Sequence, residues 1–238
     1  MEVIMIVINS LTKSYDGKKN AIENIDLEIR DGDIFGFVGL NGAGKSTTIK
    51  CLVGILSFEN GEIIINGKSI KTDPVACKEE MAYIADNPEI YAYMKGIDYI
   101  KFMMAIYRKP FDSDKVLKMA GEFELADVLN NLVSSYSHGM RQKLVLLTAF
   151  LHEPRLLVLD EPFVGLDPKA THMLRTMMKE YADKGNTIFF STHVLEVAEK
   201  LCNKVAIIKE GRIAVTGTME EITRSSSLEE FFLEVNNG

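Results

Sequence analysis

The sequence has no tryptophan and only three cysteines among its 238 residues. Cys51, Cys77 and Cys202 lie far apart along the chain, and no two of them form a Cys-x-x-Cys pair. An odd number of widely spaced cysteines argues against a disulfide framework. We therefore interpret them as buried thiols in a reducing compartment and not as catalytic groups.

An excess of basic residues is also absent. The chain carries 27 Lys and Arg residues against 34 Asp and Glu residues, which gives a formal net charge of −7. Proteins that neutralise phosphate backbones need a surplus of positive charge. The charge balance argues against nucleic acid as the main partner, and against unaided binding to an anionic membrane surface.

Long apolar runs are missing as well. The first residues, MEVIMIVINSL, are apolar but contain Glu2 and lack a basic leading region. They are typical of a first strand and not of a signal peptide. No apolar run approaches the roughly 20 residues needed to cross a bilayer. We expect a soluble chain whose membrane role, if it has one, comes through a partner.

What is present is a composition that is 47% apolar, enough for a substantial core. The pattern predicts strands at 3–8, 22–29, 34–38, 63–65, 156–159, 187–191, 205–208 and 213–216, with a hairpin turn at Asn66-Gly67. It predicts helices at 45–56, 168–184 and 194–201, a helical stretch at 93–151, and two short helices joined by 225–227. This alternation indicates an α/β sheet core with a helical insertion near the middle.

The segment GLNGAGKST follows one predicted strand and opens a predicted helix. It matches G-x-x-x-x-G-K-[ST], in which glycines let backbone N–H groups point at phosphate oxygens. Lys45 is predicted to reach the β- and γ-phosphates, and the Ser46 hydroxyl to ligate Mg²⁺. The nucleotide-binding residues predicted here are Gly39, Asn41, Gly42, Ala43, Gly44, Lys45, Ser46 and Thr47.

LLVLDEP, residues 156–162, places two carboxylates at the end of an apolar strand. Ligands bind beyond the carboxyl ends of parallel strands. Asp160 is predicted to hold Mg²⁺, and Glu161 to act as general base for the attacking water. The alternative is that these two residues are only an exposed strand end that caps a helix. The phosphate loop elsewhere in the chain makes this alternative less favourable.

Other P-loop classes fit less well. A GTPase needs an Asn-Lys-x-Asp guanine reader, and the nearest run, 203–206, is Asn-Lys-Val-Ala. A small-molecule kinase needs an acceptor site and does not need Glu161 beside Asp160.

The stretch SYSHGMRQK, residues 135–143, is small and polar and precedes an apolar run. By itself it predicts a helix start capped by Ser135 or Ser137. In order and spacing, the motifs together resemble the ATP-binding cassette (ABC) family, whose signature near LSGGQ is matched by 136–140. That resemblance covers nearly the whole chain. It implies one ABC ATPase domain over 1–238: a P-loop NTPase core with an antiparallel β subdomain (1–85 and 156–238) and a helical subdomain (about 86–155).

The resemblance also implies roles for individual residues. Two such domains bind head to tail with ATP between them, so Ser137, His138, Gly139 and Asp167 are expected at the ATP of the partner subunit. His193, in Ser-Thr-His, resembles the switch histidine that contacts the γ-phosphate, and Tyr15 resembles the aromatic that stacks on adenine. Taken alone, His193 could be a structural histidine and Tyr15 a packing residue.

Three positions depart from the family pattern. His138 and Met140 replace a Gly and the Gln of LSGGQ. Asp86 occupies the place where the family usually has a Gln that touches Mg²⁺, which adds negative charge beside a triphosphate. Asp86 is predicted as a metal ligand, with Asn87 the alternative if the loop shifts by one residue.

A partner surface is expected on the helical stretch. Aromatic and Met residues at 91–94 and 102–107 are either core or a groove for a short cytoplasmic helix of a membrane partner. The resemblance favours Tyr91 and Met94 over Phe102 for that groove. One cassette without spanning helices implies a separate permease subunit, an ATPase homodimer or heterodimer, and a cytoplasmic location on the inner face of the membrane. The sequence of residues 136–143 is similar to that of the exporter branch of the family.

A soluble ABC ATPase of translation or DNA repair is the main alternative. Translation-type members usually have two tandem cassettes and repair-type members have long heptad arms, whereas this chain has one phosphate loop and no sustained heptads. A binding module without hydrolysis is disfavoured by the presence of Lys45, Asp160, Glu161 and His193.

Overall fold

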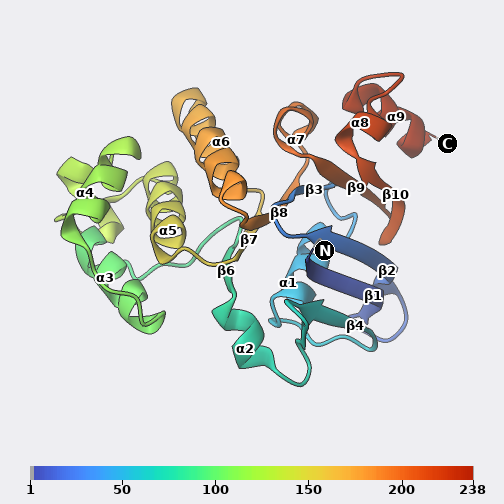
Figure 1. Ribbon diagram of the computed structural model, residues 1–238, viewed down its shortest axis with the longest axis horizontal. Coiled ribbons are helices and arrows are strands. Elements are labelled where there is room, and N and C mark those ends of the chain that lie inside the picture. The colour runs from blue at the N-terminus through green and yellow to red at the C-terminus, as the bar shows by residue number, and fades with distance from the viewer. Residues whose placement is uncertain (1–2, 238) are drawn as a thin grey trace.

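The computed structural model describes residues 3–237 and is built around two sheets (Figure 1). The larger sheet has the strand order β10-β9-β3-β8-β7-β6, and all its neighbours are parallel except β10 and β9. Its strands are β3 (Ile34–Val38), β6 (Met81–Ile84), β7 (Leu156–Asp160), β8 (Thr187–Thr192), β9 (Lys204–Lys209) and β10 (Arg212–Thr218). Every residue of β3, β7 and β8 is buried, which explains why their sequences are nearly continuous apolar runs.

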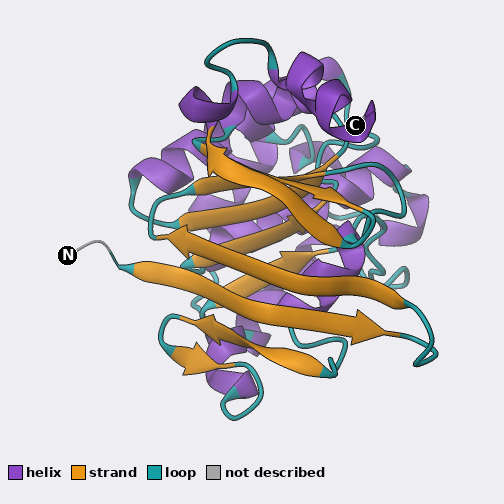
Figure 2. Ribbon diagram, turned by 90° about the vertical axis from the view of Figure 1, so that its right-hand side faces the viewer, coloured by secondary structure: helices purple, strands orange, loops and turns teal. Residues whose placement is uncertain are grey.

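The smaller sheet is antiparallel, with the order β2-β1-β4-β5. Its strands are β1 (Ile4–Ser14), β2 (Asn20–Arg30), β4 (Asn60–Ile65) and β5 (Lys68–Ser69). Figure 2 shows its long strands running across the larger sheet. Buried side chains of helix α1 (Lys45–Leu52) join both sheets in one apolar cluster. The predicted hairpin at Asn66-Gly67 is confirmed, since β4 pairs antiparallel with β5.

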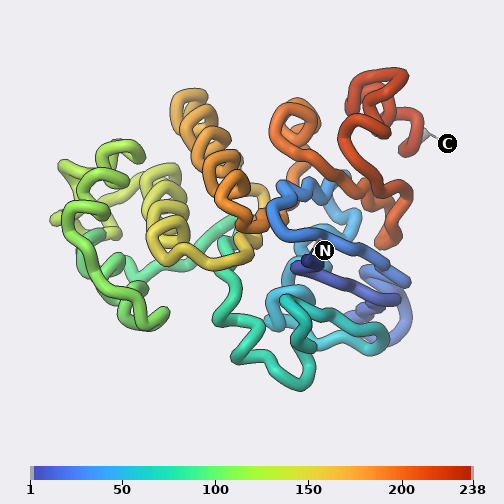
Figure 3. The backbone as a smooth tube through the Cα atoms, in the orientation of Figure 1, coloured from blue at the N-terminus to red at the C-terminus, as the bar shows by residue number. Residues whose placement is uncertain are grey.

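The remaining helices lie mostly outside the sheets. They are α2 (Pro74–Glu79), α3 (Gly96–Ile106), α4 (Ser113–Glu122), α5 (His138–His152), α6 (Pro168–Asp183), α7 (Leu195–Leu201), α8 (Met219–Ile222) and α9 (Leu228–Asn237). The chain leaves the larger sheet after β6 and returns at β7, so α3, α4 and α5 form one excursion at the side (Figure 3). None of the helices formed by residues 3–237 is long and apolar enough to cross a membrane.

The predicted α/β class is confirmed, and the errors are local. The helix expected over 45–56 ends at Leu52, because Gly54 adopts a left-handed φ of 68° and its N–H bonds back to the Cys51 carbonyl. Strand β6 and helix α2 were not predicted, and β6 is held in the sheet by its pairing with β7, which is distant in sequence. The helical stretch is broken after α3 and α4, where Arg108 and Glu124 have positive φ.

Phe189 of β8 anchors the core under the two sheets. It is fully buried, and its ring lies 5.8 Å from the ring of Phe35 and 5.4 Å from that of Phe37. We predict that Phe189→Ala lowers the free energy of unfolding by about 3–5 kcal/mol, measured by urea denaturation, because it leaves a cavity between close-packed rings. Tyr93→Ala, at a side chain that is 91% exposed, should change it by less than about 0.5 kcal/mol. Equal effects of the two substitutions would contradict this assignment of the core.

Candidate functional site

The loop between β3 and α1 adopts, at Gly44, a backbone conformation that only glycine can accommodate. Gly42 and Gly44 have φ values of 81° and 111°, and Gly44 precedes the first helical residue, Lys45. A Cβ added to Gly44 would lie 2.7 Å from the Ile22 side chain and 3.1 Å from the Ala21 carbonyl oxygen. The loop therefore delivers free N–H groups at the N-terminus of α1, an arrangement that binds anions.

Lys45 is buried at the start of α1 and is held by the loop that precedes it. Its ammonium donates to the carbonyl oxygen of Gly39 at 2.7 Å and lies 3.3 Å from that of Leu40. It is also 3.3 Å from Oε1 of Glu161, which follows β7. The sequence-predicted phosphate lysine and general base are thus in direct contact.

Glu161 also contacts the third predicted catalytic residue. Its Oε2 lies 2.9 Å from the ring nitrogen Nδ1 of His193. The same oxygen accepts a hydrogen bond from the backbone N–H of His193 at 3.3 Å. Glu161 has a φ of 51°, a left-handed conformation that is uncommon for a non-glycine residue. This conformation turns the carboxylate toward Lys45 and His193. The three residues follow the neighbouring strands β7, β3 and β8.

Ser191 fixes the two carboxylates and was not assigned this role from the sequence. Its hydroxyl donates to Asp160 Oδ1 at 2.5 Å and accepts from the Glu161 N–H at 3.0 Å. Asp160 is buried and faces Ser191 in the register of β7 and β8. The signal was available, because Ser191 directly precedes Thr192 and His193 in the predicted switch motif.

An open cleft of about 950 Å³ runs along the phosphate loop. Tyr15 stands at its edge, 64% exposed, with its hydroxyl 3.1 Å from Thr47 Oγ1. Lys18 and Lys19 also line it and were missed by the sequence analysis. An exposed aromatic face, two lysines and a ring of loop N–H groups suit a planar base joined to phosphates.

Asp86, and not Asn87, is among the residues lining the cleft. Although the residue is exposed, partial desolvation by the surrounding protein raises the pKa of its carboxyl, and the charges of Asp160 and Glu161 raise it further. His138 and His193 act in the opposite direction. Three carboxylates therefore share one negative region at the end of β6 and β7.

The residues predicted to form the signature do not line this cleft. Ser137, not Ser135, caps α5 and accepts from the Met140 N–H at 3.2 Å. Ser137 and His138 are exposed, whereas Gly139 and Gly165 approach closely: a Cβ on Gly139 would lie 3.1 Å from the Gly165 carbonyl oxygen. The cleft lining does not include Asp167, which caps α6 through the Ala170 N–H at 2.8 Å.

The donors fit a magnesium ion bound together with phosphates. Ser46 is exposed in the cleft, Asp86 lines it, and Asp160 offers a buried carboxylate. Hard oxygen donors are what Mg²⁺ prefers, and it keeps water and phosphate oxygens in most of its positions. Within residues 3–237 no group of three or more His, Cys, Asp or Glu residues forms a complete metal cage by itself.

These features define the chain as a nucleotide-binding protein of the P-loop class. A family profile described as ABC transporter matches residues 22–164. ABC-type transporter ATP-binding protein EcsA of Bacillus subtilis (strain 168) is 31% identical over 97% of this chain and 96% of that protein. The chain belongs to the ABC transporter family, and the family resemblance inferred from its motifs is confirmed.

Two further comparisons agree. The uncharacterized ABC transporter ATP-binding protein YdbJ of the same organism is 37% identical over 83% of this chain, which spans 64% of that protein. A solved structure described as an ATP-binding subunit of an ABC transporter superposes with a TM-score of 0.90, at 33% identity, over 98% of this chain and 99% of that one. The fold is therefore that of the ABC ATPase subunits.

The raised pKa of Asp86 has a consequence for stability. Between the ordinary aspartate pKa of 3.8 and its raised value, the folded chain binds more protons at Asp86 than the unfolded chain. This group's contribution therefore becomes less favourable as pH rises through that window. We predict that Asp86→Asn gains stability over the wild type on going from pH 4 to pH 7, measured by urea unfolding at each pH. A difference that is constant across this range would show that Asp86 titrates normally.

Proposed function

We propose that the chain binds and hydrolyses ATP and, as one of two head-to-tail copies, drives a separate membrane-spanning subunit. The observation that carries this proposal is Glu161, whose carboxylate lies between the Lys45 ammonium and the His193 imidazole beside the phosphate loop. A pure nucleotide-binding module has no need of a carboxylate held at that point by two cationic or polar groups.

ATP enters the cleft with its adenine on Tyr15 and its phosphates on residues 39–47. The Lys45 ammonium then exchanges the carbonyl oxygens of Gly39 and Leu40 for β- and γ-phosphate oxygens. Glu161, freed from Lys45, accepts a proton from the attacking water as the new oxygen–phosphorus bond forms and the bond to ADP breaks. His193 holds the γ-phosphate and keeps Glu161 in place through its Nδ1.

Magnesium would be held by Ser46 and Asp160, with Asp86 as a further oxygen donor. The ion supplies neutralisation of the charge on the β- and γ-phosphate oxygens. Partial burial raises the pKa of the Asp86 carboxyl, the charges of Asp160 and Glu161 raise it further, and those of His138 and His193 oppose the rise.

The N-terminus of α5 is the surface that meets the ATP of a second copy. Ser137 and His138 are exposed there, and the helix adds a partial positive charge toward a γ-phosphate. Asp167 reaches this interface only in part, since one of its oxygens caps α6 and the other faces Lys143. Two identical copies satisfy this geometry, and so does a pair of different cassettes.

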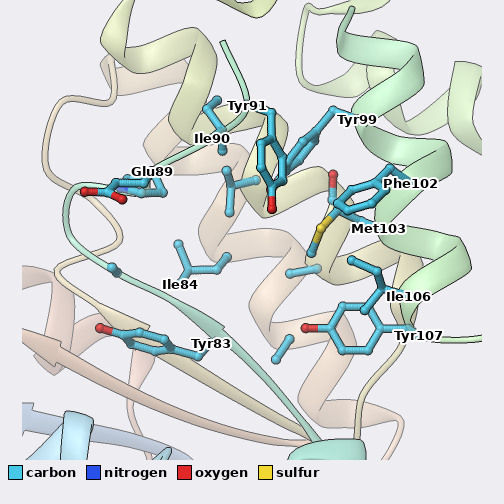
Figure 4. A pocket seen from close by; sticks show the side chains of 16 residues that line it. Tyr83, Ile84, Glu89, Ile90, Tyr91, Tyr99, Phe102, Met103, Ile106 and Tyr107 are labelled. Atoms are coloured by element: carbon cyan, nitrogen blue, oxygen red, sulfur yellow. The ribbon is translucent and has the colours of Figure 1, made fainter. Parts of the chain in front are cut away.

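A groove of about 390 Å³ between β6 and helices α3 and α5 suits the membrane partner (Figure 4). Tyr91, Tyr99, Phe102 and Met103 lie together on one side of it, and Tyr91 meets Phe102 edge to face at 5.4 Å. Tyr91 and Phe102 line the groove, but Met94 does not and packs against the core. The excursion at about 86–155 thus acts as the helical subdomain that offers this groove beside the Asp86 loop.

The permease would place the chain on the cytoplasmic face of the membrane. The sequence of the signature, residues 136–143, favours export as the direction of transport. The alternative in translation or DNA repair gains no support from the fold. Helices α3, α4 and α5 have 11, 10 and 15 residues, too short for the long arms of the repair type.

Glu161→Gln tests the catalytic assignment. We predict a loss of about 10²–10⁴-fold in ATPase rate, because the amide cannot accept the water proton. Light scattering after size exclusion should show this variant shifting from monomer to dimer on addition of MgATP. Adding Ser137→Arg should abolish the shift by filling the γ-phosphate contact. A persistent monomer with bound MgATP would contradict spontaneous homodimer closure.

The groove yields a separate prediction. Tyr91→Ala should reduce the fraction of the chain that sediments with membranes of the native host by roughly tenfold, the size expected for a buried aromatic anchor. Tyr93→Ala, which alters a neighbouring tyrosine outside the groove lining, is the matched control. Both variants should keep the ATPase rate of the isolated chain. Equal membrane recovery for the two would exclude the groove as the docking site.

A further inference from the structure

Four charged side chains of alternating sign connect α5 to the start of α6. The Lys143 ammonium lies 3.3 Å from Asp167 Oδ2 and 3.5 Å from Glu124 Oε2. Lys169 pairs with the other oxygen of Glu124. Glu124 follows α4, Lys143 lies in the second turn of α5, and Asp167 immediately precedes α6. One buried ammonium thus joins three elements that are distant in sequence.

Lys143 is the enclosed member of this group. Its side chain is only 11% exposed, whereas those of Asp167 and Glu124 are about half exposed, at 52% and 50%, and that of Lys169 is 78% exposed. The Ala170 N–H and the Lys143 ammonium both hold the pKa of Asp167 below its ordinary value. Because the Lys143 side chain is largely buried, its loss is expected to disturb the two carboxylates more than the loss of an exposed partner would.

The segment from Gly165 to Asp167 also packs along the first turn of α5. A Cβ on Gly165 would lie 2.9 Å from His138 Cδ2, and a Cβ on Gly139 would lie 3.1 Å from the Gly165 carbonyl oxygen. The contacts at Gly165 and the ion pair at Asp167 follow the same face of α5, one turn apart. Both ends of the 165–167 segment are therefore held against one helix.

We propose that Lys143 is a positioning residue that clamps the 165–167 segment to α5, so that Asp167 and the Ser137 end of α5 face a second copy as one rigid surface. Through Glu124 the clamp extends to α4. Displacement of the helical excursion therefore moves the 165–167 segment with it. This inference rests on the proposed head-to-tail function, but the contact itself exists in the single chain and can be tested there.

The first test is amide hydrogen exchange in the nucleotide-free chain. Lys143→Met should speed exchange in peptides covering 164–171 by roughly tenfold, about 1.4 kcal/mol of lost local stability. Lys143→Arg should restore slow exchange, because it keeps the cation. Lys169→Met, which removes the exposed cation of the same group, is the matched control and should leave exchange unchanged. Unchanged exchange in Lys143→Met, or an equal change in Lys169→Met, would overturn the clamp.

The second test distinguishes loss of the Lys143–Asp167 ion pair from a general loss of local stability. Asp167→Asn removes the charge but keeps a side-chain oxygen that caps α6. In that background Lys143→Met should add little further exchange, so that the two substitutions are not additive. Additive effects would show that Lys143 acts elsewhere. Should Lys143→Met fail to fold, Asp167→Asn by itself should show the faster exchange, and normal exchange there would contradict the proposal.

The third test concerns the second copy. In the Glu161→Gln background, Lys143→Met should raise the dimer dissociation constant with MgATP about tenfold, while ATP affinity of the single chain stays within about twofold. Faster exchange with unchanged dimerisation would show that the clamp does not position the interface. A Glu161→Gln chain that never dimerises would contradict homodimer closure, and the exchange results would still decide whether the clamp exists.

Discussion

The alignment of three parallel strands is the constraint on which the site depends. Strands β3, β8 and β7 are adjacent, and their carboxyl ends carry the phosphate loop, His193 and Glu161 respectively. Register pairs Val38 with Thr192 and Asp160 with Ser191, so these groups emerge at the same level of the sheet. A slip of one residue would turn each side chain to the other face and separate Glu161 from Lys45. Complete burial of these strands makes such a slip costly.

Electrostatic balance is the second constraint. Asp86, Asp160 and Glu161 gather at one edge of the sheet, and in the single chain their nearest compensation is the Lys45 ammonium, the Ser191 hydroxyl and His193. Each of these contacts is one that a phosphate or a metal can replace. In the single chain Asp160 and Glu161 are therefore already paired with protein groups.

Much of this site followed from the sequence because its chemistry resides in short contiguous motifs. Residues 39–47 and 156–162 each combine an apolar strand with the functional groups that follow it, so composition and position point to the same conclusion. Ser191 and Lys143 were harder to assign, since their roles depend on contacts with Asp160 and Asp167 at separations of 31 and 24 residues. Strand β6 was missed for a related reason: its conformation is decided by pairing with β7, more than 70 residues further along the chain.

Two of the departures from the family pattern, Asp86 and His138, belong to one electrostatic setting. Asp86 brings a carboxylate to a position where the family has a neutral amide, and His138 brings an imidazole to a position where it has glycine. The charge of His138 lowers the pKa of Asp86, against the effect of burial and of Asp160 and Glu161. His138 also packs on Gly165, next to the segment that carries Asp167. In this chain His138 and Asp86 are therefore coupled through charge, a connection that a neutral Gln and Gly would not provide.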